Sequence, residues 1–342
     1  MAQVTKVMSL VQPYAILKWA GRNVSQELSK YVQSMSYTDS LDSEQSATDE
    51  LTLSLVNNDG RFFDAWKPSE GETLEAGIGW VDASSGERHQ WIFGSFIIDG
   101  LSFGLGPDKV AIKASAKTKH RGKIDNVVSR TFKDTKLSGV TSAIASDMGV
   151  PVVFGEFEDC KVPALQQRGE STDAFLKRLV DNTLTPINIK DNRLIVGNIK
   201  QPELVLDARN RDVVISGTLP ESSKSTFGGI TVQGYDPIKQ EVFEYTAGDP
   251  NPNGKVQKLY NIDNINSIED AKRYASSYLN TSGGKSKQKA RGQLMVVNTC
   301  ARAGQIVTLQ NLGKVHPRWR IERITTSISK QRWTASLEVS RA

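Results

Sequence analysis

Apolar and polar residues alternate in a long stretch near the start of the chain. Leu51, Leu53 and Leu55 share one side of residues 50–56, while Thr52, Ser54 and Val56 take the other. Because side chains in a strand change face at every residue, this alternation predicts a strand with one buried face. Turn formers interrupt it at 57–60, and it resumes at 74–80. Two half-buried strands joined by a polar loop favour antiparallel β structure over a βαβ unit.

The same order of strands and turns returns near the end of the chain. Residues 303–309 match residues 71–78, and residues 319–324 stand where residues 96–101 stood. We therefore expect a duplicated β unit, although independent strands with ordinary β patterning would give a similar order. The other alternating runs of the two copies are 51–55 and 110–114 in the first, and 292–298 and 333–339 in the second.

Frequent turns separate short strands in the remainder of residues 1–118. This arrangement is typical of a small barrel or sandwich. The expected elements are a strand pair at 4–10 and 15–18, a strand at 28–37, an exposed acidic loop at 38–50 and a hairpin tip at 82–86.

The pattern becomes helical after residue 120. Leu137, Val140, Ile144 and Met148 follow a helical period, and Gly149 is placed to end that helix. Either Asp134 or Thr135 is expected to cap its start. A second helix is expected from Ser171 or Thr172, with short strands at 152–154 and 187–196. These elements indicate a compact α/β module.

A third helix is expected beyond a further β region. Ser267 and Asp270 have the spacing of a capping box, and Ala271, Tyr274 and Tyr278 form an apolar face behind them. The β region before it covers 213–216, 229–235 and 241–245, and a basic loop with Ser and Gly follows at 281–291.

Length and composition favour a multidomain globular protein. The chain has 342 residues, which suits two to four domains, with 38% hydrophobic and 24% charged residues. No apolar run approaches the roughly 20 residues of a membrane helix, and the N-terminus lacks the pattern of a signal peptide. The net charge is only +5. Basic clusters at 109–123 and 285–291 lack interleaved aromatic residues, so we interpret them as solvated loops.

Histidine and cysteine give no metal or thiol site in the sequence. His89, His120 and His316 share no ligand spacing, and we expect surface positions for them. Cys160 and Cys300 form no CxxC pair, as expected of a chain folded in a reducing cytosol.

Motifs for catalysis are also lacking in the sequence. Residues 284–286 resemble the end of a phosphate loop but lack its first glycine. Glu156, Glu158 and Asp159 could serve a glycosidase, which needs two carboxylates and no motif, but an acidic surface turn is the favoured interpretation. The sequence therefore assigns no catalytic, cofactor-binding or metal residue.

Taken in order, seven stretches resemble the late control protein D family, the baseplate hub or tail hub proteins of contractile phage tails. Similar hubs occur in type VI secretion spike proteins and R-type pyocins. No single stretch is diagnostic, but their order and spacing are specific. The stretches are LTLSLVNNDGRFFDAWKPSEGETLEAGIGW, GSFIIDGLSF, KLSGVTSAIASDMGV, STDAFLKRLVDNTLTPINIKDNRLIVG, TVQGYDPIKQEVFEYTAGD, SIEDAKRYASSYL and AGQIVTLQNLG.

The resemblance implies a mainly β fold with α+β modules. Its parts would be two tail-tube-like β-barrels, an α/β module between them and a small helical insertion in the second barrel. On this chain the expected boundaries are 1–118 for the first barrel, 119–200 for the module, 201–238 with 285–342 for the second barrel, and 239–284 for the insertion with one helix.

The resemblance also implies a structural function without catalysis or cofactor. Such hubs are homotrimers that adapt a hexameric tail tube to a trimeric central spike, contact other baseplate proteins and leave a channel for DNA in transit. We expect a late protein of the virion tail, assembled in the host cytoplasm without membrane anchoring. Two alternatives stay open: a peptidoglycan-degrading tail enzyme, which a zymogram would reveal, and a nucleic-acid-binding module, which salt-dependent DNA retardation would reveal.

Overall fold

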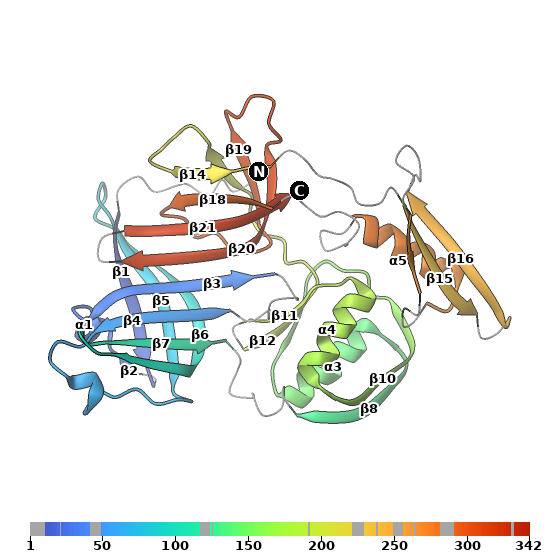
Figure 1. Cartoon of the computed structure of the whole chain (residues 1–342), viewed down its shortest axis with the longest axis horizontal. Helices are drawn as coiled ribbons and strands as arrows, with labels where there is room; N and C mark the ends of the chain where they lie inside the picture. Colours follow the sequence, from blue (N-terminus) through green and yellow to red (C-terminus); the bar gives the residue numbers. More distant parts are fainter. Residues whose placement is uncertain are drawn as a thin grey trace.

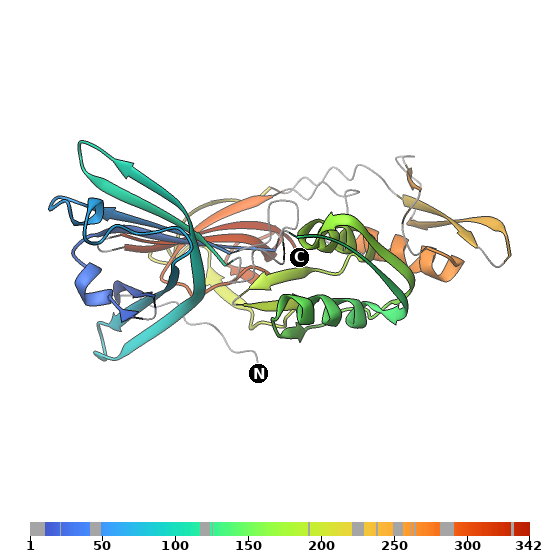
Figure 2. The ribbon, with the colours of Figure 1, turned by 90° about the horizontal axis from the view of Figure 1, so that it is seen from below.

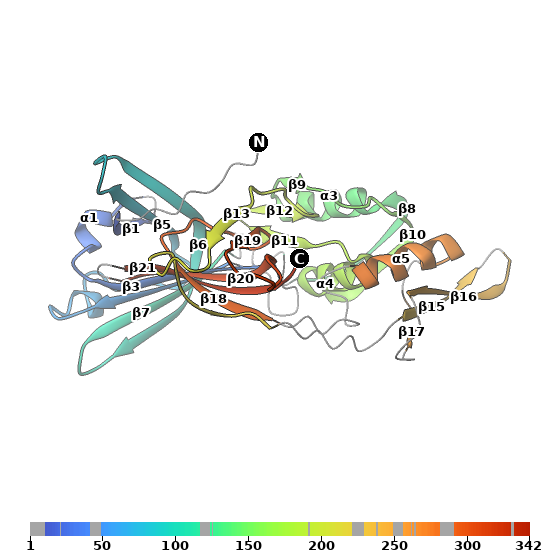
Figure 3. The same ribbon diagram turned by 90° about the horizontal axis from the view of Figure 1, so that it is seen from above.

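The fold is mainly β, as expected, with three longer helices (Figure 1). The computed structural model of the chain describes residues 11–20, 22–41, 49–116, 124, 126–190, 192–220, 229–236, 239–248, 256–260, 262, 265–280, 291–329 and 332–342. Seen from below and from above, with the long axis horizontal, the largest sheet occupies one end, two helices lie in the middle and a small sheet with one helix occupies the other end (Figures 2 and 3).

A 13-stranded sheet carries most of the β structure. Its N-terminal strands are β1 Val11–Trp19, β2 Arg22–Asn23, β3 Val32–Ser40, β4 Glu50–Val56, β5 Thr73–Asp82, β6 Arg88–Gly104 and β7 Lys109–Ser115, with the short helices α1 Ser25–Leu28 and η2 Arg61–Phe63 between them. Its later strands are β13 Leu204–Asp207, β14 Val214–Thr218, β18 Gly292–Val297, β19 Ile306–Gln310, β20 Arg318–Ser329 and β21 Arg332–Arg341.

The two sets of strands have the same topology. Strands β4 to β7 pair in the order β4-β7-β6-β5, and strands β18 to β21 pair in the order β18-β21-β20-β19. An antiparallel neighbour flanks the first strand of each set, β3 beside β4 and β14 beside β18. The other flank differs, because β1 runs antiparallel to β5 whereas β13 runs parallel to β19. The duplicated order of strands expected from the sequence is therefore present, and we call β3–β7 and β14 with β18–β21 the first and second β units.

Strand β20 joins the two β units into one sheet. Its first residues pair with β19, and its later residues pair antiparallel with β3, from Arg323 opposite Ser40 to Ser329 opposite Ser34. Strand β21 runs along its other side. Since a backbone ladder crosses from one unit to the other, the units are not two independent domains connected by a linker.

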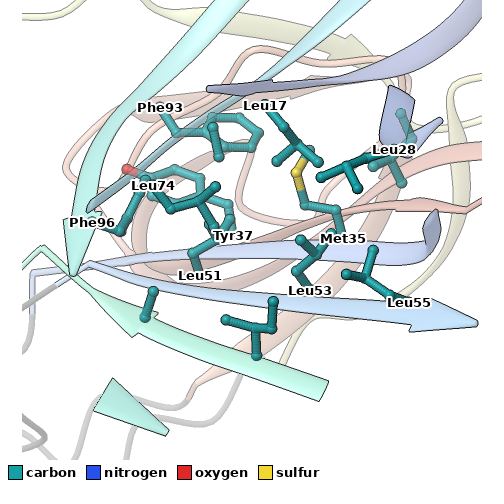
Figure 4. Packing of buried hydrophobic residues seen from close by; sticks show 14 of the residues in the cluster. Leu17, Leu28, Met35, Tyr37, Leu51, Leu53, Leu55, Leu74, Phe93 and Phe96 are labelled. Carbon is teal, nitrogen blue, oxygen red and sulfur yellow. The ribbon is translucent and has the colours of Figure 1, made fainter. Parts of the chain in front are cut away.

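Each β unit has its own apolar core, and the first core also contains residues of the second unit. Figure 4 shows the first core, with Leu51, Leu53 and Leu55 of β4 pointing toward Met35 and Tyr37 of β3. This confirms the buried face predicted from the alternation. The first core also includes Ile328 and Trp333 from β20 and β21. The second core comprises Leu204, Leu206, Val214, Leu294, Val296, Ala301, Ala303, Val307, Leu309, Trp319, Ile321, Ile324, Ala335, Leu337 and Val339.

The middle of the chain forms an α/β module with a separate core. Helices α3 Leu137–Met148 and α4 Thr172–Thr183 have the predicted apolar faces, and Gly149 ends α3 with a φ of 72°. The long antiparallel pair β8 Val127–Lys136 and β10 Lys161–Ser171 was not predicted. The remaining strands are β9 Val152–Phe154, β11 Ile187–Lys190 and β12 Arg193–Val196.

A fourth core belongs to a small sheet covered by one helix. The sheet consists of β15 Gly229–Asp236, β16 Glu241–Gly248 and β17 Val256–Leu259, and the helix is α5 Ile268–Asn280. Ser267 accepts a hydrogen bond from the Asp270 N–H, as the capping box predicts. The expected boundary at 238/239 separates β15 from β16, yet these two strands pair along their whole length.

Two local predictions in the first β unit are wrong. The strand expected at 28–37 begins only at Val32, because α1 ends at Leu28 and a turn occupies residues 29–31. The exposed loop expected at 38–50 instead begins with the end of β3, and Asp39, Ser40 and Asp49 are buried. Residues 4–10 of the predicted N-terminal strand pair, and His120, lie outside the described residues.

Candidate functional site: a buried charge cluster between three parts of the chain

One lysine and two aspartates meet where the first β unit, the α/β module and the second β unit come together. Lys190 lies at the end of β11, Asp39 in β3, and Asp49 immediately before β4. The Lys190 ammonium forms an ion pair with Asp39, and its Nζ lies 3.5 Å from Asp49 Oδ1. Asp39 Oδ2 also accepts a hydrogen bond of 3.0 Å from the Ala303 N–H. We call Tyr37, Asp39, Asp49 and Lys190 the junction cluster.

The junction cluster is almost closed to solvent. The side chains of Asp39, Asp49 and Lys190 are 1%, 5% and 15% exposed. The Tyr37 hydroxyl donates a 2.6 Å hydrogen bond to Asp49 Oδ2, whereas Asp49 Oδ1 has no hydrogen-bond partner among the described residues. An ion pair taken out of water is tolerated only when further hydrogen bonds satisfy its charges. Here the groups that satisfy them come from different segments of the chain, so the pair is stable only while these segments keep their arrangement.

Burial sets the protonation of the junction cluster. It raises the pKa of Asp49 to about 6, against the attraction of the Lys190 ammonium. Burial and the two neighbouring carboxylates raise the pKa of Tyr37, so the phenol keeps the proton that it donates. Burial opposes the charge on Lys190, but Asp39 and Asp49 outweigh it and raise the pKa of that ammonium. The cluster therefore acts as a structural joint whose net charge changes in mildly acidic solution.

Further polar contacts connect the same parts of the chain. Gln305 of the second unit donates a 2.6 Å hydrogen bond to the Pro202 carbonyl, and Arg320 donates one of 3.0 Å to Asn198 Oδ1. The Trp333 ring lies 5.2 Å from the Trp80 ring of the first unit. Apolar packing, sheet pairing and buried charges thus all cross the junction between the two β units.

Two of the three carboxylates considered for a glycosidase have structural contacts, and the third residue is held through its backbone. Asp159 accepts hydrogen bonds of 2.8 Å from the N–H and the hydroxyl of Ser138, in the first turn of α3. Asp159 therefore caps the start of α3. The prediction that Asp134 or Thr135 would cap this helix is wrong, because both residues belong to β8. Glu158 lies 3.7 Å from Arg273, and the Glu156 backbone bridges to residue 198.

The two described histidines each pack against a tryptophan. The His89 ring stacks on Trp80 and lies 3.6 Å from Glu87, while the ring of His316 packs edge-on against Trp319. No cluster of three potential metal ligands occurs among the described residues. Burial raises the pKa of the Cys160 thiol, and that of Cys300 to about 12, so neither thiol is a ready nucleophile.

Only part of each basic cluster at 109–123 and 285–291 lies among the described residues. Lys109 and Lys113 are exposed on β7, while residues 117–123 and 281–290 lie outside the described residues. None of the described helices is long and apolar enough to cross a membrane.

A pocket of about 250 Å³ lies beside α1 and η2, where Glu72 accepts a 2.7 Å hydrogen bond from the Trp19 indole and Trp66 packs edge-on against Phe62.

The sequence interpretation missed the aspartates of the junction cluster. A signal for Asp39 was present, because the period of two that buries Met35 and Tyr37 continues to residue 39. The period of two that buries Leu51, Leu53 and Leu55 likewise extends back to residue 49. Nothing local to Lys190 in the sequence indicates two partners more than 140 residues away; its separation from Asp39 is 151 residues.

Comparison with known proteins relates this chain to phage tail proteins. No family model matches the chain. The probable baseplate hub protein of Escherichia phage P2 is 26% identical over 188 residues, which cover 55% of this chain and 46% of that protein. The chain thus aligns with about half the length of this curated relative.

Solved structures share the fold over nearly the whole chain. The 43 kDa tail protein of prophage MuSo2 from Shewanella oneidensis has a TM-score of 0.68 at 15% identity, covering 96% of this chain and 98% of that one. An E. coli component of the type VI secretion system has a TM-score of 0.54 at 11% identity, covering 95% and 76%. The comparisons confirm the resemblance drawn from the sequence: this chain is similar to phage baseplate hub proteins and has the fold of phage tail and type VI secretion proteins.

Proposed function

We propose that the chain is the structural hub of a contractile tail baseplate, in a phage or a tailocin. It acts as a homotrimer that adapts a hexameric tail tube to a trimeric central spike. The observation that carries this proposal is the repeated topology, β4-β7-β6-β5 and β18-β21-β20-β19, within one sheet. Three chains with two like units each would arrange six units around an axis, so a threefold assembly could meet a sixfold partner.

The junction between the units supports a mechanical role. A hub must transmit the thrust of sheath contraction without its two β units separating. Strand pairing of β20 with β3, the packing of Trp333 in the first core and the buried junction cluster all resist such separation. Asp159 holds the start of α3, Glu158 lies beside Arg273 and the pKa values of both thiols are raised, which supports a protein that assembles and does not catalyse.

The proposed partners follow from this position in the tail. The chain would contact the tail tube protein, the central spike protein and other baseplate proteins, and DNA would pass through the ring in transit. It would belong to the virion tail and assemble in the bacterial cytoplasm without membrane anchoring. The match to a P2 baseplate hub protein supports the tail location.

Light scattering on the purified chain, alone and mixed with the spike protein, tests this function. We expect a trimer in at least one of the two samples, and a six-lobed ring in low-resolution images of it. Monomers in both samples would refute the hub. A zymogram of the same preparation tests the peptidoglycan-degrading alternative, and a clear zone of lysis would contradict the purely structural role.

A further inference from the structure

The later part of β6 has an open edge. Strand β5 pairs with β6 only as far as Ile97, whereas β7 continues along the other side of β6 to Gly104. The loop before β5 adds one exchange of hydrogen bonds at Ile98, through Gly71 and Glu72. No other strand of the described chain pairs with β6 at residues 100–104. Ser102 and Phe103 of this segment are exposed.

Strand β14 has the second open edge. It forms the end of the large sheet, and β18 is the only strand with which it pairs among the described residues. Ser216, Gly217 and Thr218 are exposed. An open edge leaves a row of N–H and C=O groups ready to pair with another strand.

The two open edges are equivalent to two strands that already pair within the chain. By the shared topology, β6 corresponds to β20 and β14 corresponds to β3. The later part of β20 pairs with β3, and this is the contact that joins the two units of one chain. Among the described residues, no strand pairs with the corresponding edge of β6 or with the outer edge of β14. We call the pairing of β20 with β3 the intrachain seam. It shows the geometry that a seam between two chains would have.

Side chains next to both edges fit the same seam. Across β20 and β3, Ser327 Oγ lies 3.1 Å from Ser36 Oγ, and Thr325 Oγ1 lies 3.2 Å from Thr38 Oγ1. The edge strands themselves present short side chains on this face, Gly100, Ser102 and Gly104 on β6, and Ser216 and Thr218 on β14. On β6 the side chains of Lys113 and Lys109 from β7 pack against Gly100 and Gly104. Short side chains on the edge strands leave room for a neighbouring strand.

We infer that β14 of one chain pairs antiparallel with the later part of β6 of a second copy, repeating the β20–β3 seam between subunits. This inference rests on the proposed trimer and specifies its interface. Three such seams, alternating with the three intrachain seams, close the sheet into a ring with no open edge at these strands. Because each copy offers one edge of each kind, the contact is head-to-tail, and such a contact fixes the number of chains only when the rotation between copies closes a ring.

Cross-linking between the two edges tests the pairing. Ser102→Cys and Thr218→Cys are combined in a chain that carries Cys160→Ala and Cys300→Ala, and a short bismaleimide is added at the concentration where light scattering reports trimers. Directly opposite and diagonal residues of paired strands are close enough for such a linker. We expect covalent dimers and trimers and no larger species. The controls should remain monomeric on a denaturing gel. They are each single cysteine variant and a double variant that combines Thr218→Cys with Ser85→Cys, because Ser85 lies at the hairpin tip of residues 82–86, away from the open edge of β6.

A charge exchange gives a second, independent measurement. Ser102→Asp with Thr218→Asp places like charges across the seam and should raise the dissociation constant by about 1.5- to 5-fold for each interface, as cross-strand pairs do. Ser102→Asp with Thr218→Lys should restore the original value. Ser102 and Thr218 are both exposed in the single chain, so the monomer should unfold at an unchanged denaturant concentration.

The outcomes separate the interface from the proposed function. Trimers without cross-links, or trimers that the paired aspartates leave unchanged, would overturn the strand pairing while the trimeric hub stands. Light scattering that shows only monomers would refute the hub and the pairing together. Cross-linked ladders longer than a trimer would overturn the closed ring.

Discussion

Replacing Lys190 by methionine removes the only cation that contacts both buried aspartates of the junction cluster among the described residues. Asp39 would keep the Ala303 N–H, and Asp49 would keep the Tyr37 hydroxyl, but both would lose the ammonium that pairs with them. Breaking a buried ion pair by removing one partner leaves an uncompensated charge and costs about 3–5 kcal/mol. We expect Lys190→Met to lower the free energy of unfolding by an amount of this order at about pH 7.5.

The cost should depend on pH in a defined direction. The pKa of Asp49 is raised from its ordinary value of 3.8 to about 6, so its contribution to stability is present below about pH 4 and is lost as pH rises toward 6. At about 1.4 kcal/mol for each pH unit, the difference corresponds to a loss on the order of 3 kcal/mol. Without Lys190, which lowers the pKa of Asp49, this carboxyl would hold its proton to still higher pH. The cost of Lys190→Met should therefore shrink at about pH 4.5.

Guanidinium unfolding followed by tryptophan fluorescence at these two pH values measures both effects. The matched control is Lys177→Met, which breaks an exposed ion pair of 2.9 Å with Asp173 on α4. Exposed helix pairs contribute about 0.3–0.5 kcal/mol, so the control should change little at either pH. If Lys190→Met costs no more than the control, or costs more at the lower pH, the account of the junction cluster is wrong.

Three other changes test separate features. Trp333→Ala should lower the free energy of unfolding by about 3–5 kcal/mol, because it empties a fully buried ring position shared by both β units. Gly149→Ala should cost about 1 kcal/mol, because residue 149 ends α3 with a φ of 72°. The Cys300 thiol, with a pKa of about 12, should react with iodoacetamide at about pH 8 far more slowly than after unfolding. Denaturant titration checks the first two, and mass spectrometry checks the third.

Each of these changes has its own comparison. Trp333→Phe keeps an aromatic ring in place and should cost less than the alanine variant. Ser146→Ala, at an exposed position of the same helix as Gly149, should not destabilise the chain. Alkylation of Cys300 at equal rates in the folded and unfolded chain would contradict its burial, and a Trp333→Ala variant as stable as the unchanged chain would contradict the shared core.

Local patterns predicted the local structure well. The period of two placed Leu51, Leu53 and Leu55 in the first core, and the helical period together with Gly149 defined α3. The repeated order of strands also predicted the shared topology of the two β units. The same pattern could have extended β3 to Asp39, but an acidic residue near a polar segment favoured a loop.

Contacts between distant segments could not be predicted in this way. Pairing of β20 with β3, the location of Trp333 in the first core and the partners of Lys190 depend on how whole units pack. The pairing of β15 with β16 was likewise hidden, because alternation identifies a strand but not its neighbour. Asp159 reaches the start of α3 from 21 residues further along the chain, which a search for a local capping residue does not cover.

The seam between β3 and β20 has a consequence for synthesis on the ribosome. Ser36 and Ser327, which face each other across it, are separated by 291 residues. At about 5–20 residues per second, the edge of β3 emerges on the order of tens of seconds before its partner strand exists. During that interval the nascent first unit presents an unpaired strand edge and a core that still lacks Ile328 and Trp333. Synthesis of β20 and β21 is therefore needed to close the first unit, and a chain truncated before β20 would keep this edge of β3 unpaired.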